Sequence, residues 1–188
     1  MKPKRPTTAD TASSVGYDRC QTPPYAAEPL QAILPPHTRI WECAAGEGQL
    51  SSALRQQGHT VIESDLLTGR NFFTWQPDHW ECIVTNPPYS VKYHWLERCY
   101  DLGKPFALLV PVEMIGAWKA QRLFLRYGVE LLLLNRRVNF SMPRRGYSGG
   151  GAQFPVLWLT WQMTGQALSF ATITQRADVQ ASLFEALP

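Results

Sequence analysis

Four consecutive residues, Asn86-Pro87-Pro88-Tyr89, combine the groups that a planar amine substrate needs. They follow the apolar residues 82–84 and Thr85, so they stand at the end of a predicted strand. Two prolines fix the backbone and remove two N–H donors, which leaves carbonyl groups without competing donors beside them. The Asn86 side chain supplies a further acceptor, and Tyr89 supplies a flat ring for stacking. We interpret this run as a substrate site, with a structural turn as the alternative.

An earlier run, Glu42-Cys43-Ala44-Ala45-Gly46-Glu47-Gly48, leads from an apolar stretch through small residues into a helix-like segment. Small residues let a ligand lie against the backbone at the carboxyl end of a strand, where doubly wound sheets bind cofactors. The spacing is not that of a pyrophosphate-binding loop. The chain also lacks the Gly-Lys-Ser/Thr of a phosphate loop, which disfavours a nucleoside triphosphate. A plain tight turn is the alternative interpretation.

Two further groups of residues suit a nucleoside ligand. Glu63 and Asp65 end a second predicted strand, where a carboxylate can accept hydrogen bonds from ribose hydroxyls. We favour Asp65 because it stands at the strand end, and a solvated surface acid is the alternative for both. The Asn71 amide could read an adenine edge while Phe72 packs on its face. Burial in the core is the alternative for Phe72 and for Phe73.

The segments that must position these runs alternate between strand-like and helix-like patterns. This alternation predicts an α/β fold, with a mostly parallel sheet covered by helices on both faces. The expected strands span residues 39–42, 60–64, 82–85, 106–110, 129–134 and 155–161, and the expected helices span residues 25–34, 49–57, 91–102 and 118–127.

The order of these runs resembles that of adenine-N6 DNA methyltransferases, which belong to the amino-methyltransferase branch of the S-adenosylmethionine-dependent enzymes. The similarity begins at Thr22-Pro23-Pro24 and ends at Phe140, so it covers most of the chain. Between these ends it includes residues 42–48, 71–73 and 86–89. It implies a Rossmann-like methyltransferase fold and S-adenosylmethionine as cofactor. The implied activity is methyl transfer to the N6 amine of a flipped adenine in DNA.

The same resemblance implies roles for individual residues. Asn86 and the Pro87 carbonyl would bind the target amine, supported by Pro88, and the rings of Tyr89 and Phe140 would sandwich the base. Cys43 departs from the family, where proline is common, and so does Asn71, where aspartate is usual. The residues implied in cofactor binding are Thr22, Pro23, Glu42, Ala44, Gly46, Gly48, Glu63, Asp65, Asn71 and Phe72.

Two segments near the ends of the resemblance suggest macromolecular partners. Residues 139–151 are basic, aromatic and glycine-rich, and we expect Arg144, Arg145 and Tyr147 to contact a nucleic-acid backbone; a solvated loop is the alternative. Residues 180–184, with Gln180, Leu183 and Phe184, resemble the peptide by which bacterial proteins bind the replicative sliding clamp. The alternative for this run is an amphipathic turn that packs on the body of the protein.

Composition limits the remaining choices. The 188 residues, 45% of them apolar, suffice for one substantial core. We expect a flexible basic arm over residues 1–20, one domain over 21–170 and a tail over 171–188. No stretch approaches the roughly eighteen apolar residues of a membrane span, and no secretory signal is present, so we expect a soluble protein in the cytoplasm of a prokaryotic or phage-infected cell. The four cysteines stand singly, so we expect no metal site.

Three other functions fit the same residues. An RNA adenine-N6 methyltransferase needs the same catalytic groups, and only its contacts with the nucleic acid differ. A protein glutamine N5-methyltransferase also uses an Asn-Pro-Pro-Tyr run, but such enzymes usually carry a helical substrate domain that this chain has little room for. A non-catalytic accessory protein that binds DNA or the clamp would not need two acceptors beside a cofactor site.

Overall fold

The computed structural model describes residues 20–141 and 154–174. The expected N-terminal arm lies almost wholly outside these residues, as do the residues expected to contact a nucleic-acid backbone and those of the clamp-like run, so these assignments stay predictions. The residues in question are Arg144, Arg145 and Tyr147 for the backbone, and Gln180, Leu183 and Phe184 for the clamp.

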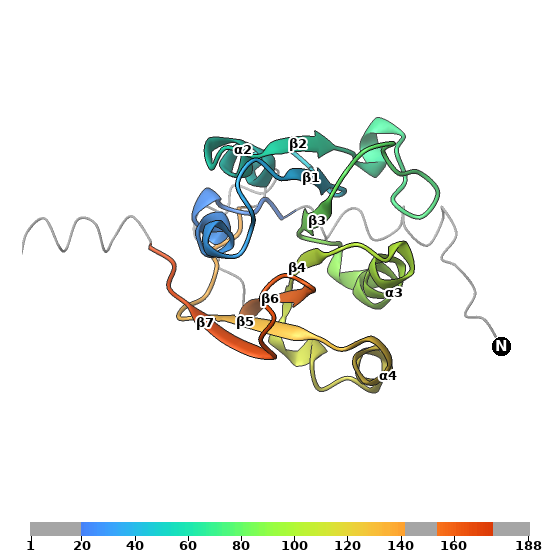
Figure 1. Cartoon of the computed structure of the whole chain (residues 1–188), viewed down its shortest axis with the longest axis vertical. Helices are drawn as coiled ribbons and strands as arrows, with labels where there is room; N and C mark the ends of the chain where they lie inside the picture. Colours follow the sequence, from blue (N-terminus) through green and yellow to red (C-terminus); the bar gives the residue numbers. More distant parts are fainter. Residues whose placement is uncertain (1–19, 142–153, 175–188) are drawn as a thin grey trace, which may run out of the picture.

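The described residues form a seven-stranded sheet with the order β2-β1-β3-β4-β6-β5-β7 (Figure 1). Neighbouring pairs are parallel from β2 to β4, whereas β6 is antiparallel to both β4 and β5. The mostly parallel α/β fold expected from the sequence is therefore confirmed. The strands are β1 (Arg39–Glu42), β2 (Thr60–Glu63), β3 (Cys82–Thr85), β4 (Phe106–Pro111), β5 (Glu130–Leu134), β6 (Val156–Trp161) and β7 (Leu168–Ala171).

Strand β7 was not among the strands expected from the sequence. It pairs in parallel with β5 and extends the sheet past residue 170. The Glu130 carboxylate at the start of β5 fixes the turn that leads into it, because it accepts hydrogen bonds from the backbone N–H groups of Met163, Thr164 and Gly165 at 2.9–3.0 Å. Glu130 is more than thirty positions away from this turn, so the contact cannot be inferred from the four residues of β7 alone.

Helices cover both faces of the sheet. The 3-10 helix η1 (Pro24–Ala32) and helix α2 (Gln49–Gln56) lie on one face, and α3 (Lys92–Leu102) and α4 (Trp118–Tyr127) lie on the other (Figure 1). Three short 3-10 helices, η2 (Leu66–Thr68), η3 (Tyr89–Val91) and η4 (Val112–Met114), follow β2, the Asn-Pro-Pro run and β4. The helix expected over residues 25–34 is thus of the 3-10 type. Pro29 inside it has no N–H for an α-helical bond.

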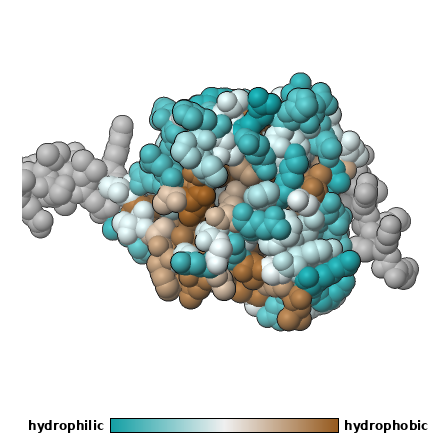
Figure 2. Space-filling model, in the orientation of Figure 1, coloured by the Kyte–Doolittle hydropathy of each residue, from teal (hydrophilic) through white to brown (hydrophobic). Residues whose placement is uncertain are grey.

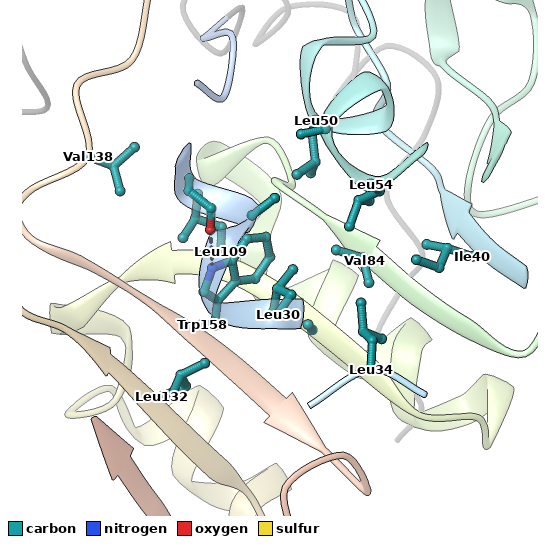
Figure 3. Packing of buried hydrophobic residues seen from close by; sticks show 14 of the residues in the cluster. Leu30, Leu34, Ile40, Leu50, Leu54, Val84, Leu109, Leu132, Val138 and Trp158 are labelled. Carbon is teal, nitrogen blue, oxygen red and sulfur yellow. Dashed lines mark hydrogen bonds between the residues drawn. The ribbon is translucent and has the colours of Figure 1, made fainter. Parts of the chain in front are cut away.

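Alternate residues of the central strands pack into two separate cores. Ile40, Val84 and Leu109 face η1 and α2, whereas Trp41 and Ile83 face α3 and α4. Figure 3 shows the first core, in which leucines of η1 and α2 contact the strands and the Trp158 indole N–H donates to the Ala26 carbonyl at 2.8 Å. Burial on both faces explains why β3 and β4 consist almost entirely of apolar residues.

The surface of the protein is more apolar near β7 than near α2 and β2 (Figure 2). In Figure 2 the area over β5 and β7 is brown, whereas the area over α2 and β2 is teal. Leu168 and Phe170 of β7 are large apolar residues with 49% and 77% of their surfaces exposed. No helix of the described segments is long and apolar enough to cross a membrane.

Candidate functional site

The carboxyl ends of β1, β2 and β3 meet at one edge of the sheet because the three strands are parallel neighbours. Glu42 ends β1 and is the register partner of Glu63, which ends β2. Asn86 follows the last residue of β3. The sequence runs that were expected to bind cofactor and substrate therefore start from the same edge.

Glu42 is a buried carboxyl group, only 1% exposed, at the end of β1. Its Oε1 accepts hydrogen bonds from the Thr85 hydroxyl and, at 3.1 Å, from the Ala44 N–H. Its Oε2 is buried and has no hydrogen-bond partner among the described residues. Burial raises the pKa of Glu42 to about 8, against the opposing effect of these two hydrogen bonds. The side chain is therefore mostly protonated at pH 7.

The loop after Glu42 depends on two glycines with positive φ. Gly46, at φ +53°, donates its N–H to Asp65 Oδ2 at 3.0 Å. Gly48, at φ +79°, precedes the first turn of α2, and a Cβ atom there would lie 3.3 Å from Glu63 Oε1. Ala44 is half-buried between Glu42 and this turn. Small residues are required here because the backbone lies close to both acids.

The two acids at the carboxyl end of β2, Glu63 and Asp65, already have partners in the protein. Asp65 accepts hydrogen bonds from Gly46 and, through Oδ1, from the Leu67 N–H at 2.8 Å, so it connects the loop after β1 to η2. Glu63 forms an ion pair with Arg55 at 2.9 Å. Each carboxylate has more lone pairs than these contacts use, so either one could still accept a hydrogen bond from a ribose hydroxyl.

Gln21 is a residue of the site that the sequence analysis did not single out. Its side-chain Oε1 accepts the Glu47 N–H at 3.1 Å, and its amide lies so close to Gly46 that a Cβ there would be 3.0 Å away. Its backbone exchanges hydrogen bonds of 2.8 and 3.2 Å with Ser141. Gln21 therefore joins the segment before η1, which contains buried Thr22 and half-buried Pro23, to the loop after β1.

Of the two residues expected to bind the adenine of the cofactor, Asn71 lies in a local turn and Phe72 lies in the core. The Asn71 side chain accepts the Phe73 N–H at 2.9 Å in a local turn. Phe72 is 3% exposed and stacks on Trp95, with ring centroids 4.1 Å apart and planes 17° apart. Its ring therefore packs in the core, which leaves little of its surface for a ligand. Phe73, at 7% exposure, packs in the same core.

Asn86 carries a second buried polar atom without a partner among the described residues, its side-chain Oδ1. Pro87 is buried and Pro88 is half-buried beside it. The rings of Tyr89 and Phe140 are neighbours, with centroids 6.4 Å apart, but they are nearly perpendicular at 85°. A base held between two rings requires the rings to face each other, so the expected sandwich is not formed in this conformation.

The structure thus brings most of the expected site residues to one edge of the sheet and places Phe72 in the core. It adds Gln21 and Thr85, whose contacts to Glu47 and Glu42 span 26 and 43 positions and so leave no mark in local sequence. No group of three or more His, Cys, Asp or Glu that could hold a metal ion occurs in residues 20–141 and 154–174.

No protein-family model matches the chain, and no curated protein matches its sequence. Among solved structures, a candidate class I S-adenosylmethionine-dependent methyltransferase from Listeria monocytogenes is similar, with a TM-score of 0.52 and 12% identity, covering 88% of this chain and 70% of that one. A candidate RNA methyltransferase from Pyrococcus horikoshii has a TM-score of 0.42 and 10% identity, with 84% of each chain covered. The 23S rRNA methyltransferase ErmE has a TM-score of 0.43 and 14% identity, with 86% of this chain and 74% of that chain covered.

The first of these three similarities is strong enough to identify the fold. Together with the sheet order, it shows that the chain has the Rossmann-like fold of the class I S-adenosylmethionine-dependent methyltransferases. Fold alone does not specify the reaction, which depends on the residues of the site.

Proposed function

We propose that the protein transfers a methyl group from S-adenosylmethionine to the N6 amine of adenine in DNA. The observation that supports this most directly is the buried Asn86 Oδ1, an acceptor with no partner in the described residues, at the carboxyl end of β3 and next to the Pro87 carbonyl. An unpaired buried acceptor costs about 1–3 kcal/mol, so its presence favours a ligand that donates a hydrogen bond there.

The edge formed by β1 and β2 suits the cofactor. The buried Glu42 Oε2 has no partner among the described residues, so a hydroxyl of the cofactor could form a hydrogen bond with it. The backbone at Gly46 and Gly48 lies too close to Gln21 and Glu63 to carry a side chain, which keeps the loop compact beside this atom. Glu63 or Asp65, at the carboxyl end of β2, would hold the ribose hydroxyls, and Gln21 would hold the loop after β1 in place through its bond to the Glu47 N–H. When bound, S-adenosylmethionine supplies an electrophilic methyl group.

The side chains would act mainly by positioning the amine. The lone pair of an aromatic amine is delocalised into the ring, which makes the nitrogen a poor nucleophile. If Asn86 Oδ1 and the Pro87 carbonyl accept hydrogen bonds from its two N–H groups, the nitrogen turns toward tetrahedral geometry and its lone pair could bond to the methyl carbon. The carbon–sulfur bond would break as this bond forms, which would leave the cofactor as a neutral thioether, and the methylated nitrogen would then lose one proton to water. The Tyr89 ring would stack on the flipped base and offset part of the few kcal/mol that unstacking costs.

A transfer assay tests the proposal. Labelled methyl from S-adenosylmethionine is offered in parallel to DNA, RNA and a release-factor protein, with products resolved as modified nucleosides or amino acids. We expect N6-methyladenine in DNA for the wild type and its loss in Asn86→Ala. The matched control is Gln166→Ala, which removes an exposed amide in the turn between β6 and β7 and should retain activity.

The other outcomes separate the competing functions. Label in RNA or in glutamine would keep the fold and cofactor but exclude the proposed substrate. Cofactor binding without transfer to any substrate would indicate a non-catalytic accessory protein. Equal activity of the wild type and Asn86→Ala would show that the unpaired acceptor on β3 is not the substrate site.

A further inference from the structure

Helix α4 presents an uninterrupted basic stripe on its exposed side. Its sequence, Trp118–Tyr127, contains three cations and no acid. Lys119, Arg122 and Arg126 are spaced three and four residues apart, so they share one face, and all three are exposed. The opposite face, which includes Ala120 and Phe124, packs on the core beneath α3 and α4.

Aromatic rings are interleaved with these cations. The Tyr93 ring, at the start of α3, has the Lys92 ammonium 5.2 Å and the Lys119 ammonium 5.6 Å from its centroid, so cations from two helices converge on it. Trp118 is 63% exposed, and the Arg122 guanidinium lies 5.6 Å from its ring. We call these five residues, Lys92, Tyr93, Trp118, Lys119 and Arg122, the α3–α4 basic surface.

This surface adjoins the proposed substrate site. The Lys92 ammonium donates a hydrogen bond to the Tyr89 carbonyl at 3.3 Å, and α3 begins directly after η3. Helix α4 begins after β4 and η4, so its first turn lies at the same edge of the sheet as Asn86, with α3 and α4 side by side (Figure 1). The charges therefore start within a few residues of the Asn-Pro-Pro-Tyr run.

The cations of this surface lack acidic partners in the described residues, where the only ion pair joins Arg55 to Glu63. Glu97 and Asp101 stand one and two turns further along α3 than Tyr93. Several like charges held close together repel one another, and an approaching anion relieves that repulsion. Cations interleaved with exposed rings suit nucleic acid better than an acidic peptide, because the rings stack on bases while the cations pair with phosphates.

We propose that the α3–α4 basic surface binds the DNA backbone next to the target nucleotide, with the exposed Trp118 ring stacking on a neighbouring unpaired base. Lys92 and Lys119 would contact the phosphates closest to the flipped adenine, and Arg122 a phosphate further along. The inference rests on the proposed function for the identity of the nucleic acid. It assigns DNA contacts to residues other than those expected around Arg144 and Arg145.

Binding of a fluorescent DNA oligonucleotide, followed by anisotropy at several salt concentrations, tests the surface without relying on catalysis. The logarithm of the association constant falls as the logarithm of the salt concentration rises. Each lost phosphate contact should make this slope less steep, by about 0.7 for single-stranded and about 0.9 for duplex DNA. For Lys119→Gln combined with Arg122→Gln we therefore expect a slope smaller by about 1.4–1.8. The control is Arg39→Gln, which removes an exposed cation at the amino end of β1, away from the site; its slope should match the wild type.

A second pair of variants tests the stacking contact. Trp118→Ala should weaken binding of single-stranded DNA at least about fivefold, the lower end of a base–aromatic contact. Leu125→Ala on the same helix, where Leu125 is 90% exposed, should leave binding unchanged. Because all substituted residues are exposed, unfolding should not obscure the comparison.

The outcomes distinguish this inference from the proposed function. An unchanged salt slope in the double variant, or an equal reduction of the slope in the Arg39→Gln control, would refute DNA binding by the α3–α4 basic surface. A reduced slope without methyl transfer to DNA would support the surface and refute the proposed function. Tighter binding of RNA than of DNA of the same sequence, with the same dependence on Lys119 and Arg122, would overturn the assignment of DNA as the ligand.

Discussion

Replacing Glu42 by glutamine should abolish a pH dependence of stability that this one buried carboxyl imposes. Its pKa rises from an ordinary value of 4.5 to about 8 because burial disfavours the charged form. The folded chain therefore holds this proton more tightly than the unfolded chain does. The resulting stabilisation is complete below pH 4.5 and is lost as the pH rises toward 8.

The size of the effect follows from the pKa difference. One pKa unit corresponds to about 1.4 kcal/mol, so a shift from 4.5 to about 8 amounts to about 5 kcal/mol in total. Between pH 6 and pH 8 the free energy of unfolding should fall by about 2 kcal/mol, because the slope flattens near the folded-state pKa. Glutamine keeps an acceptor for the Thr85 hydroxyl and the Ala44 N–H but does not titrate.

Urea unfolding at pH 6, 7 and 8 measures this difference. We expect the stability of the wild type relative to Glu42→Gln to fall by about 2 kcal/mol across that range. Glu47→Gln, which alters an exposed carboxyl of the same loop, controls for general charge effects. A constant difference between the wild type and Glu42→Gln from pH 6 to pH 8 would show that Glu42 is not held neutral by burial.

Three further predictions follow from contacts described above. Gln21→Ala should weaken S-adenosylmethionine binding by about 1 kcal/mol in calorimetry, because the Glu47 N–H loses its acceptor, whereas Gln21→Glu should retain most of the affinity. Phe72→Ala should lower the free energy of unfolding by about 3–5 kcal/mol, and Phe170→Ala, at an exposed position, by less than about 0.5 kcal/mol; similar losses for both would contradict the core position of Phe72. Glu130→Ala should accelerate amide hydrogen exchange in β7 more than in β1, since the turn before β7 loses three hydrogen bonds.

The sequence predicted the parts of the fold that depend on local pattern. Strands β3 and β4 are buried on both faces, so their apolar runs are unmistakable, and helix α4 alternates its apolar and basic residues with helical period. Strand β7 escaped prediction because its two exposed apolar residues give no such pattern and Glu130, far away in the sequence, fixes its turn. Proline explains the remaining difference, the 3-10 geometry of η1.

The candidate site was predictable to the extent that parallel strands end at a common edge. Glu42 ends one apolar strand and Asn86 follows another, and the two strands are parallel neighbours, so both residues lie at this edge. The role of Gln21 could not be inferred, because it depends on a loop 26 residues away. The orientation of Phe72 was also ambiguous, since an aromatic residue after a turn can face either a ligand or the core, and here Trp95 stacks on it.

The position of β6 has a consequence for how the chain acquires its structure during synthesis. This strand, residues 156–161, is synthesised after both β4 and β5, yet it lies between them and is antiparallel to both. A nascent chain that has not yet emerged beyond residue 161 cannot join β5 to β4, and it exposes the backbone edges of both strands. The sheet can therefore close only after β6 has been synthesised, and a chain that stops before β6 should aggregate rather than fold into a smaller domain.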